Sequence, residues 1–185
     1  MALILASASP RRRELLSLIT KDFTVETSRV DEAAITAPTP AKLAQALADA
    51  KCRAVAARHP EDIVIGCDTV VDYAGRVFGK PKDHEDALRM LRALSGAQHH
   101  VHTGVCIAFP GGEERFTVTT KVKFYPIEEA QLEAYAATGE PYDKAGAYAI
   151  QGIGGKYVSH VNGHMDTVIG LPCELLEELL SRLVF

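Results

Sequence analysis

A short segment near the amino terminus carries residue types that bind phosphate. Its letters are SASPRRRELL, residues 7–16, and its Ser9-Pro10 pair predicts a helix start that three arginines, 11–13, follow. The free N–H groups at a helix start favour acidic residues in the first turn. Three like charges there instead predict an anionic ligand such as a phosphate chain, to which Ser7 and Ser9 would add hydroxyl donors. The alternative is a solvated basic helix start with a plain serine cap.

A second segment places a carboxylate inside an apolar run. Asp68 lies among the β-branched residues of the stretch 63–71 and not at the turn that follows, so its charge needs another explanation. Pairing Asp72 with Arg76 across that turn predicts a hairpin in which Asp68 faces Lys80. Such a pair suits a water-activating base beside a phosphate-binding charge. The alternative is a structural ion pair between two strands.

Other metal-binding and nucleotide-binding patterns are less specific. The acidic pair Asp31-Glu32 offers carboxylates for hydrated Mg²⁺, which binds few protein carboxylates and several waters, although the same pair also fits a solvated loop. The histidines at 99, 100 and 102 lack the fixed partner spacing of a metal site and are interpreted as polar residues at a strand start. The fingerprints of P-loop ATPases and of dinucleotide oxidoreductases are absent from the sequence.

Alternating strand-like and helix-like segments must position these side chains. The patterns predict strands at 3–6, 23–27, 63–71, 76–78, 101–109, 114–124 and 157–161, and helices at 10–19, 40–58, 83–94, 128–137 and 172–183. In the second helix the expected buried face carries Leu43, Ala46, Leu47 and Ala50. Asn162-Gly163 predicts a hairpin turn. The sum is an α/β fold with a mixed twisted sheet and flanking helices.

The amino-acid composition limits the classes of protein to which this chain can belong. The chain has 185 residues, 47% of them hydrophobic and 24% charged, which predicts one soluble globular domain over 1–185. Twenty basic residues against 24 acidic ones argue against a nucleic acid polymer or an anionic membrane as partner. Neither a signal peptide nor a spanning segment is recognisable, and the four scattered cysteines fit buried thiols, so we expect a cytoplasmic protein.

The motifs together resemble the Maf family of nucleoside triphosphate pyrophosphatases. They occur in order as LASASPRRRELL at 5–16, DE at 31–32, CDT at 67–69, GKP at 79–81, TGV at 103–105, GEPYDKAGAYAIQG at 139–152 and GLP at 170–172. The resemblance implies an inosine triphosphate pyrophosphatase-like fold, in which a mixed sheet bends around a central cleft between two lobes, and often a homodimer. It also implies metal-dependent hydrolysis of a nucleoside triphosphate to the monophosphate and pyrophosphate.

Three positions resemble the branch of that family that acts on dTTP and UTP. They are Arg11, Thr69 and Gln151, where the branch that takes 7-methylguanosine triphosphate tends to carry Trp, Gln and Glu. A Gln amide offers both a donor and an acceptor to a uracil or thymine edge, whereas a Glu carboxylate suits the donor edge of guanine. Ala149 departs from the family pattern, which usually has Gly there.

The resemblance leads to a mechanistic hypothesis. A divalent cation, Mg²⁺ or Mn²⁺, held by Glu32 and Asp68 would bridge the triphosphate, and Asp68 would accept a proton from the water that attacks the α-phosphorus. Whether Asp68 is chiefly base or chiefly metal ligand stays open. The charge on the leaving pyrophosphate would be neutralised by Arg11, Arg12, Lys51 and Lys80. For Lys51 the alternative is a solvated lysine. A nucleotide-binding regulator of cell division with little turnover, and the same hydrolysis on another base, including modified pyrimidines, are the alternative functions.

Overall fold

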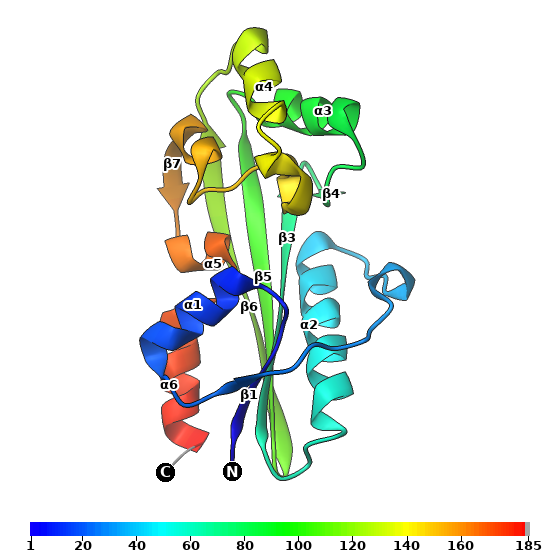
Figure 1. The fold of residues 1–185 in the computed structure, drawn as a ribbon, viewed down its shortest axis with the longest axis vertical. Helices are drawn as coiled ribbons and strands as arrows, with labels where there is room; N and C mark the ends of the chain where they lie inside the picture. Colours follow the sequence, from blue (N-terminus) through cyan, green and yellow to red (C-terminus); the bar gives the residue numbers. More distant parts are fainter. Residues whose placement is uncertain (184–185) are drawn as a thin grey trace.

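A single mixed sheet of seven strands runs through the computed structural model, which describes residues 1–183 (Figure 1). Its strands are β1 (Leu3–Ala6), β2 (Thr24–Val25), β3 (Ile63–Tyr73), β4 (Arg76–Phe78), β5 (Gln98–Phe109), β6 (Gly112–Phe124) and β7 (Val158–Asn162). The α-helices are α1 (Pro10–Ile19), α2 (Pro40–Ala56), α3 (His84–Leu94), α4 (Glu129–Ala136), α5 (Met165–Ile169) and α6 (Cys173–Leu183). Short 3₁₀ turns are η1 (Glu32–Ala34), η2 (Glu140–Asp143), η3 (Ala145–Ala147) and η4 (Ile153–Tyr157).

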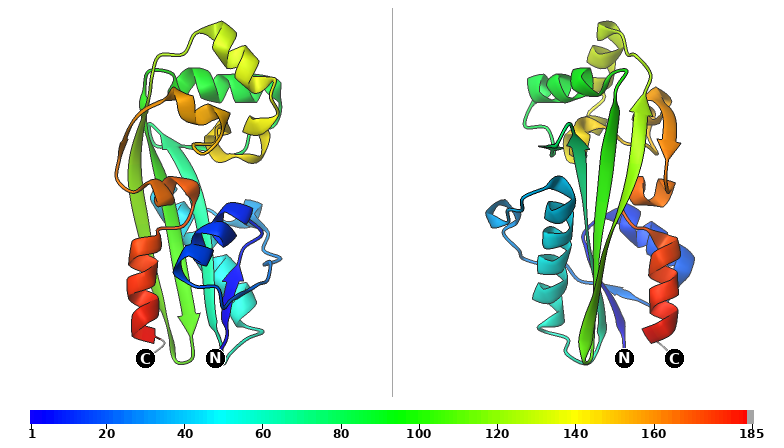
Figure 2. Two further views of the ribbon diagram at one scale, coloured as in Figure 1. Left: turned by 60° about the vertical axis from the view of Figure 1, so that its left-hand side comes forward. Right: turned by 180° about the vertical axis from the view of Figure 1, so that it is seen from behind.

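The strand order is β2-β1-β3-β5-β6-β7, with β4 paired to β3. Strand β1 is parallel to β2 and β3, whereas β3–β4, β3–β5, β5–β6 and β6–β7 are antiparallel. The long strands β5 and β6 join a lower lobe, where α2 covers one face of the sheet and α1 with α6 the other, to an upper lobe with α3 and α4 (Figure 2). The predicted mixed α/β architecture with two lobes is confirmed.

One edge of β3 is only partly covered. Strand β5 pairs along its other edge, while β1 pairs with residues 63–66 and β4 with residues 71–73. Within the described part of the chain, residues 67–70 therefore have no strand beside them on this edge. The gap lies between the two lobes, and no strand among residues 1–183 pairs there with the backbone N–H and C=O groups of this edge.

Helix α2 lies unusually close to the sheet because two glycines face it. A Cβ built on Gly66 would lie 2.5 Å from the carbonyl oxygen of Ala48, and one built on Gly104 would lie 2.5 Å from that of Ala44. The buried residues of α2 are Ala44, Leu47, Ala48, Asp49, Cys52 and Val55. Of the four residues expected on the buried face, only Leu47 is buried. The helix instead directs its small residues toward the two glycines, which allows the close approach.

The predicted register of the β3–β4 hairpin is wrong by one residue. Ala74 and Gly75 both have positive φ, at 52° and 79°, which makes a two-residue turn of the primed kind that suits hairpins. Tyr73 therefore pairs with Arg76, where the prediction placed Asp72. Asp72 instead accepts a hydrogen bond from the Gly75 N–H and stabilises the turn.

The register shift removes the predicted cross-strand partner of Asp68. The β3–β4 ladder ends where Val71 pairs with Phe78, before Lys80 is reached, and Asp68 pairs with Gly104 on β5. The predicted pairing of Asp68 with Lys80 is wrong, because a one-residue slip moves every side chain of a strand to a new partner.

Two further predictions differ from the structure. The strand expected at 23–27 forms ladder pairs only at Thr24–Val25. After β7 the chain enters α5 rather than a hairpin partner, because Thr120 exchanges two hydrogen bonds of 3.1 Å with the backbone of His164 and holds it against β6. The remaining predicted strands and helices are confirmed in type; those at 3–6, 10–19 and 76–78 have the predicted ends, and the ends of the others are shifted by up to three residues. No helix among residues 1–183 is long and apolar enough to cross a membrane.

Candidate active site

A cleft of about 880 Å³ lies between the lobes, within the range of small-molecule sites. Both lobes line it, and it includes the open edge of β3. The ten predicted site residues all line this cleft: Ser7, Ser9, Arg11, Arg12, Glu32, Lys51, Asp68, Thr69, Lys80 and Gln151. They come from segments far apart in the sequence, and the fold brings them to one place.

Lys51 lies between the two predicted carboxylates. Its Nζ is 2.5 Å from Asp68 Oδ1 and 3.0 Å from Glu32 Oε1. The side chains of Lys51 and Asp68 are each 12% exposed, so this ion pair is largely shielded from water, whereas Glu32 is open to solvent. The interpretation of Lys51 as a solvated lysine is therefore wrong. The close approach of α2 to β3 delivers the ammonium to the carboxylate.

The two carboxylates fit a divalent cation that keeps most of its own water. Both reach the same ammonium, so Glu32 and Asp68 lie within reach of one cation. Magnesium in phosphate-binding sites is held by one or two carboxylates together with substrate oxygens and water, which is the donor set present here. Among residues 1–183 no group of three or more His, Cys, Asp or Glu side chains is arranged to bind a metal. Asp31 accepts a hydrogen bond from the Ala33 N–H and caps η1.

The start of α1 is built as the sequence predicts, and one of its arginines is fixed in place. Ser9 is the N-cap, and its hydroxyl accepts from the Arg12 N–H at 3.4 Å. The Arg12 guanidinium donates to the Gly170 carbonyl at 2.8 Å, to the Thr69 hydroxyl at 3.0 Å and to the Ser7 hydroxyl at 3.4 Å. These bonds hold a cation at the cleft without neutralising its charge.

The cleft has more positive than negative charge available to a ligand. Lys51 is occupied by Glu32 and Asp68, and Lys144 is paired with Asp143. The remaining cations that line the cleft form no ion pair within residues 1–183; they are Arg11, Arg12 and Lys80. Although the whole chain has a net charge of −4, this local excess favours an anionic ligand.

The upper part of the cleft is mainly apolar. Its walls include Val71, Val101, Val168 and the rings of Phe78 and Tyr148. The Tyr148 hydroxyl is hydrogen-bonded to His99 Nε2 at 2.8 Å, and burial raises the pKa of this tyrosine above its usual range. Gln151 adds an amide beside this wall. An apolar wall with one amide suits a flat heterocycle that needs a donor and an acceptor at its edge.

The loop that carries Gln151 tolerates the unusual Ala149. Ala149 does not adopt a positive φ, since only Ala74 and Ala147 do so among the described non-glycine residues. The departure from the family pattern therefore introduces no backbone strain. Sequence reasoning missed the roles of Asp143, Lys144 and Tyr148 at the cleft, although all three lie in the segment GEPYDKAGAY that carried the resemblance.

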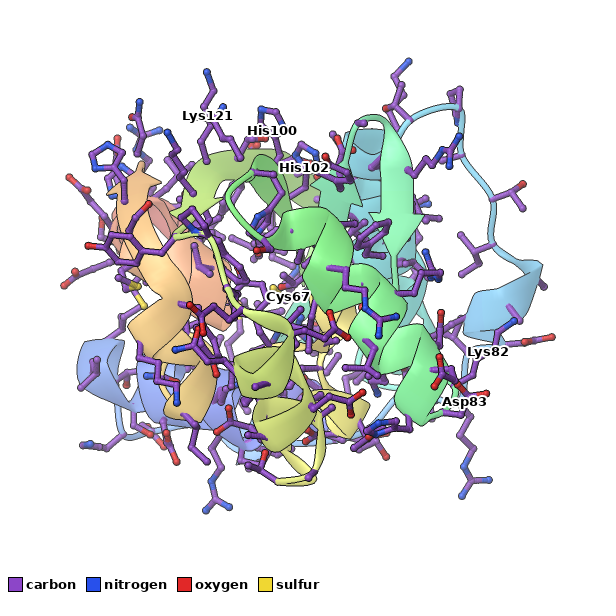
Figure 3. All side chains as sticks on the ribbon, turned by 90° about the horizontal axis from the view of Figure 1, so that it is seen from above. Cys67, Lys82, Asp83, His100, His102 and Lys121 are labelled. Carbon is purple, nitrogen blue, oxygen red and sulfur yellow. The ribbon has the colours of Figure 1, made fainter. Side chains whose placement is uncertain are left out.

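The histidines of β5 and the four cysteines are not among the residues that line the cleft. His100 and His102 stack with ring centroids 6.0 Å apart, near Lys121, and His102 bonds to Asp72 at 3.2 Å (Figure 3). Their interpretation as polar residues of a strand is in agreement with these contacts. Cys67 lies in the interior, where burial raises the pKa of its thiol to about 11 (Figure 3). Three of the four thiols are buried, as predicted, and that of Cys173 is partly exposed.

Comparisons with known sequences match this chain along nearly all of its length. The sequence model of the family described as Maf-like protein matches residues 2–183. A dTTP/UTP pyrophosphatase of Moorella thermoacetica is 50% identical over 181 residues, covering 97% of this chain and 93% of that protein. The protein of the same name from Thermococcus gammatolerans is 48% identical, covering 96% of this chain and 94% of that protein. The one from a Geobacillus strain is 46% identical, covering 98% of this chain and 97% of that protein.

Solved structures give the same fold at low sequence identity. The Ham1 protein of Staphylococcus aureus superposes with a TM-score of 0.55 at 17% identity, covering 98% of this chain and 99% of that one. A Ham1 protein from Coxiella burnetii gives 0.53 at 14% identity, covering 98% and 100%. The inosine triphosphate pyrophosphatase-like fold implied by the resemblance is thereby confirmed.

Proposed function

The chain belongs to the Maf-like protein family, and from its site we propose that it hydrolyses dTTP and UTP to the monophosphate and pyrophosphate. Such an enzyme would act in nucleotide metabolism by cleansing the nucleotide pool. The relatives named dTTP/UTP pyrophosphatase, at 46–50% identity over almost the whole chain, support the reaction and the pyrimidine substrates.

The observation that carries the proposal is the charge arrangement of the cleft. A largely buried carboxylate, Asp68, lies in the same cleft as three cations that form no ion pair within residues 1–183. A triphosphate needs both features, because the cations bind the phosphates while the carboxylate acts on the attacking water. A neutral or cationic ligand would leave Arg11, Arg12 and Lys80 uncompensated.

The residues divide the chemistry as follows. Asp68 accepts a proton from water as the water oxygen forms a bond to the α-phosphorus, and the bond from that phosphorus to the bridging oxygen of the β-phosphate breaks. Lys51 orients the Asp68 carboxylate and, with Arg11, Arg12 and Lys80, stabilises the charge that moves onto the leaving pyrophosphate. Ser7 and Ser9 add hydroxyl donors at the start of α1.

Base choice is proposed to rest on Gln151 and Thr69. Gln151 would offer its amide to the uracil or thymine edge beside the apolar wall of Phe78 and Tyr148. The Thr69 hydroxyl bonds to Arg12 and, at 2.9 Å, to the Thr103 hydroxyl, so it fixes the floor of the cleft between the phosphate and base regions.

A divalent cation, Mg²⁺ or Mn²⁺, is proposed as cofactor, with Glu32 and Asp68 as its protein ligands. When bound it would neutralise phosphate charge and polarise a phosphoryl oxygen. The chemistry of these two carboxylates supports this assignment, because hard oxygen donors are what these ions prefer.

The direct test is a product analysis with a panel of nucleoside triphosphates and Mg²⁺. We expect monophosphate and pyrophosphate from dTTP and UTP and little from guanine nucleotides. Asp68→Asn should lower kcat by about 10³-fold or more, because general base catalysis is lost and a metal ligand is weakened. Asp22→Asn, an equal change of charge at an exposed position outside the cleft, is the matched control.

Other outcomes would contradict the proposal. Full turnover by Asp68→Asn would exclude Asp68 as the acting carboxylate, and release of orthophosphate would exclude attack at the α-phosphorus. Tight nucleotide binding without turnover would favour the alternative of a regulatory nucleotide-binding protein. Preference for 7-methylguanosine triphosphate would move the chain to the other branch.

Two broader properties are also proposed, a homodimer and a cytoplasmic location. The homodimer is supported by the family resemblance alone, and light scattering on the purified protein would show a single-chain mass if it is wrong. The location is supported by four free cysteines, three of them buried, which fit a reducing compartment. Cell fractionation tests it.

A further inference from the structure

Glu140 has more hydrogen-bond donors around its carboxylate than its place on the surface of a short turn requires. It begins η2, and its two oxygens accept from the Tyr135 hydroxyl at 2.6 Å, the Ile153 N–H at 2.9 Å and the Gly154 N–H at 3.0 Å. Two of these donors belong to the backbone just after Gln151. The carboxylate therefore joins η2 and α4 to the segment that carries the proposed base-selecting amide.

Tyr135 holds the other side of the same segment. Its hydroxyl donates to Glu140 and accepts from the Ala149 N–H at 3.2 Å. The tyrosine is almost fully buried, and its ring packs edge-on against that of Tyr157 at 5.5 Å. The Tyr135 hydroxyl and the Glu140 carboxylate thus fix the backbone at residues 149, 153 and 154, on both sides of Gln151.

The side chain of Gln151 has no comparable support of its own. It lines the cleft and forms no hydrogen bond to another side chain or backbone group within residues 1–183. Its direction therefore depends on the backbone of residues 149–154, which the pair of Glu140 and Tyr135 holds.

Two glycines allow the backbone to approach this pair. A Cβ on Gly152 would lie 1.9 Å from Glu140 Oε1, and a Cβ on Gly154 would lie 2.5 Å from the Tyr135 hydroxyl oxygen. Neither glycine has a positive φ, so close approach rather than turn geometry explains them. Any larger residue at either position would overlap these side-chain atoms and so disturb the contact between the segment and the pair.

The ionisation of the pair agrees with this geometry. Burial raises the pKa of Glu140, but the Tyr135 hydroxyl and the two backbone N–H groups outweigh it and lower the pKa below its usual value. Burial and the bond to Glu140 raise the pKa of Tyr135 above its usual range. A charged acceptor and a neutral donor are the states in which all four hydrogen bonds form.

We propose that Glu140 and Tyr135 are positioning residues that set base selectivity by holding the Gln151 loop, residues 149–154, at the mouth of the base pocket. The proposal rests on the proposed function, because it assigns a role in choosing among nucleoside triphosphates. It concerns residues outside the reacting groups, since neither Glu140 nor Tyr135 lines the cleft. A ligand edge that must meet both donor and acceptor atoms of Gln151 is sensitive to small displacements of this loop.

The test uses Glu140→Gln and Tyr135→Phe, with Glu133→Gln and Tyr125→Phe as matched controls. The Glu133 side chain lies on α4 and bonds to His84, and Tyr125 is exposed; within residues 1–183 neither side chain forms a hydrogen bond to the loop. We expect Glu140→Gln to lower the ratio of kcat/KM for UTP over CTP by about tenfold, mostly through KM for UTP, as befits loss of a charge-assisted hydrogen bond. The controls should change this ratio less than about twofold.

A double-variant comparison separates positioning from general damage. In a Gln151→Ala background, Glu140→Gln should change the ratio less than about twofold, because the group it positions is gone. An equal loss in both backgrounds would overturn the proposal, as would an unchanged ratio in Glu140→Gln.

Hydrogen exchange without nucleotide distinguishes this proposal from the function it rests on. Amides of residues 149–154 should exchange about tenfold faster in Glu140→Gln than in the wild type, while those of β5 and β6 keep their rates. Unchanged exchange would overturn the proposal even if UTP hydrolysis is found. Absence of UTP hydrolysis in the wild type would overturn the proposed function, and the exchange rates would still decide whether Glu140 holds the loop.

Discussion

Replacing Gly104 with Ala should damage the candidate active site by pushing helix α2 away from the sheet. The new Cβ would lie 2.5 Å from the Ala44 carbonyl oxygen and 2.7 Å from the Gln45 Cα. Ordinary contacts to a Cβ begin near 3.4 Å, and the opposing atoms are backbone, so no side chain rotation relieves the overlap. Helix α2 must therefore move away from the sheet by about 1 Å.

The movement reaches the site because the same helix carries Lys51. Its Nζ is 2.5 Å from Asp68 Oδ1, and Asp68 stays on β3, so a shift of about 1 Å lengthens this contact to about 3.5 Å. Overpacking of this kind costs about 1–3 kcal/mol of unfolding free energy. A misplacement of about 1 Å in a catalytic group can cost about 100-fold in rate. We expect both losses in the same variant.

Urea unfolding and steady-state kinetics with UTP measure the two effects separately. Gly112→Ala is the matched control, because its new Cβ would meet only the ring of Phe109, at 3.1 Å, at the far end of the β5–β6 hairpin. The control should stay within about 0.5 kcal/mol and keep its kcat. A Gly104→Ala protein with wild-type stability would refute the packing argument. A destabilised but fully active one would refute the requirement for Lys51 beside Asp68.

Two further outcomes are expected. Burial lowers the pKa of His99 to about 4, against 6.5 for an exposed histidine, so below pH 6.5 the unfolded chain binds a proton that the folded chain does not. The free energy of unfolding should then fall by about 2 kcal/mol between pH 7 and pH 5, and His99→Gln should remove this fall. Urea titrations at both pH values measure it. An equal fall in variant and wild type would contradict the burial of a neutral His99. Chelation with EDTA should abolish UTP hydrolysis, and Mg²⁺ or Mn²⁺ should restore it. Glu32→Gln should need about tenfold more cation for its half-maximal rate. An unchanged cation requirement in this variant would remove Glu32 from the proposed ligands.

Local sequence signals predicted the parts of the fold that depend on few neighbours. Ser9-Pro10 predicted the start of α1 because an N-cap and a first-turn proline act within one turn. The β5–β6 pair followed from two β-branched runs around a Pro-Gly-Gly turn. Register did not follow, because whether the turn at Ala74-Gly75 holds two or three residues depends on backbone angles that composition leaves free.

The residues of the candidate site line one cleft, as a set predicted together would, but their contacts were not predicted. Motifs brought Lys51 and Asp68 into the same hypothesis, yet the ion pair that joins them depends on α2 lying against Gly66 and Gly104. That contact links positions far apart in the chain, and neither helix nor strand periodicity records it. The same holds for Glu140, whose partners at 135, 153 and 154 meet only after three segments fold together.

The gap along β3 also has a consequence for association between molecules. An unpaired strand edge can recruit a strand from another chain and so begin aggregation. Here the open stretch is only residues 67–70, about 13 Å of backbone, and β1 and β4 block it at both ends. A strand of ordinary length from another chain cannot pair along so short an edge, whereas a small ligand can reach it from the cleft. The edge is therefore accessible to a ligand while it resists sheet-to-sheet growth.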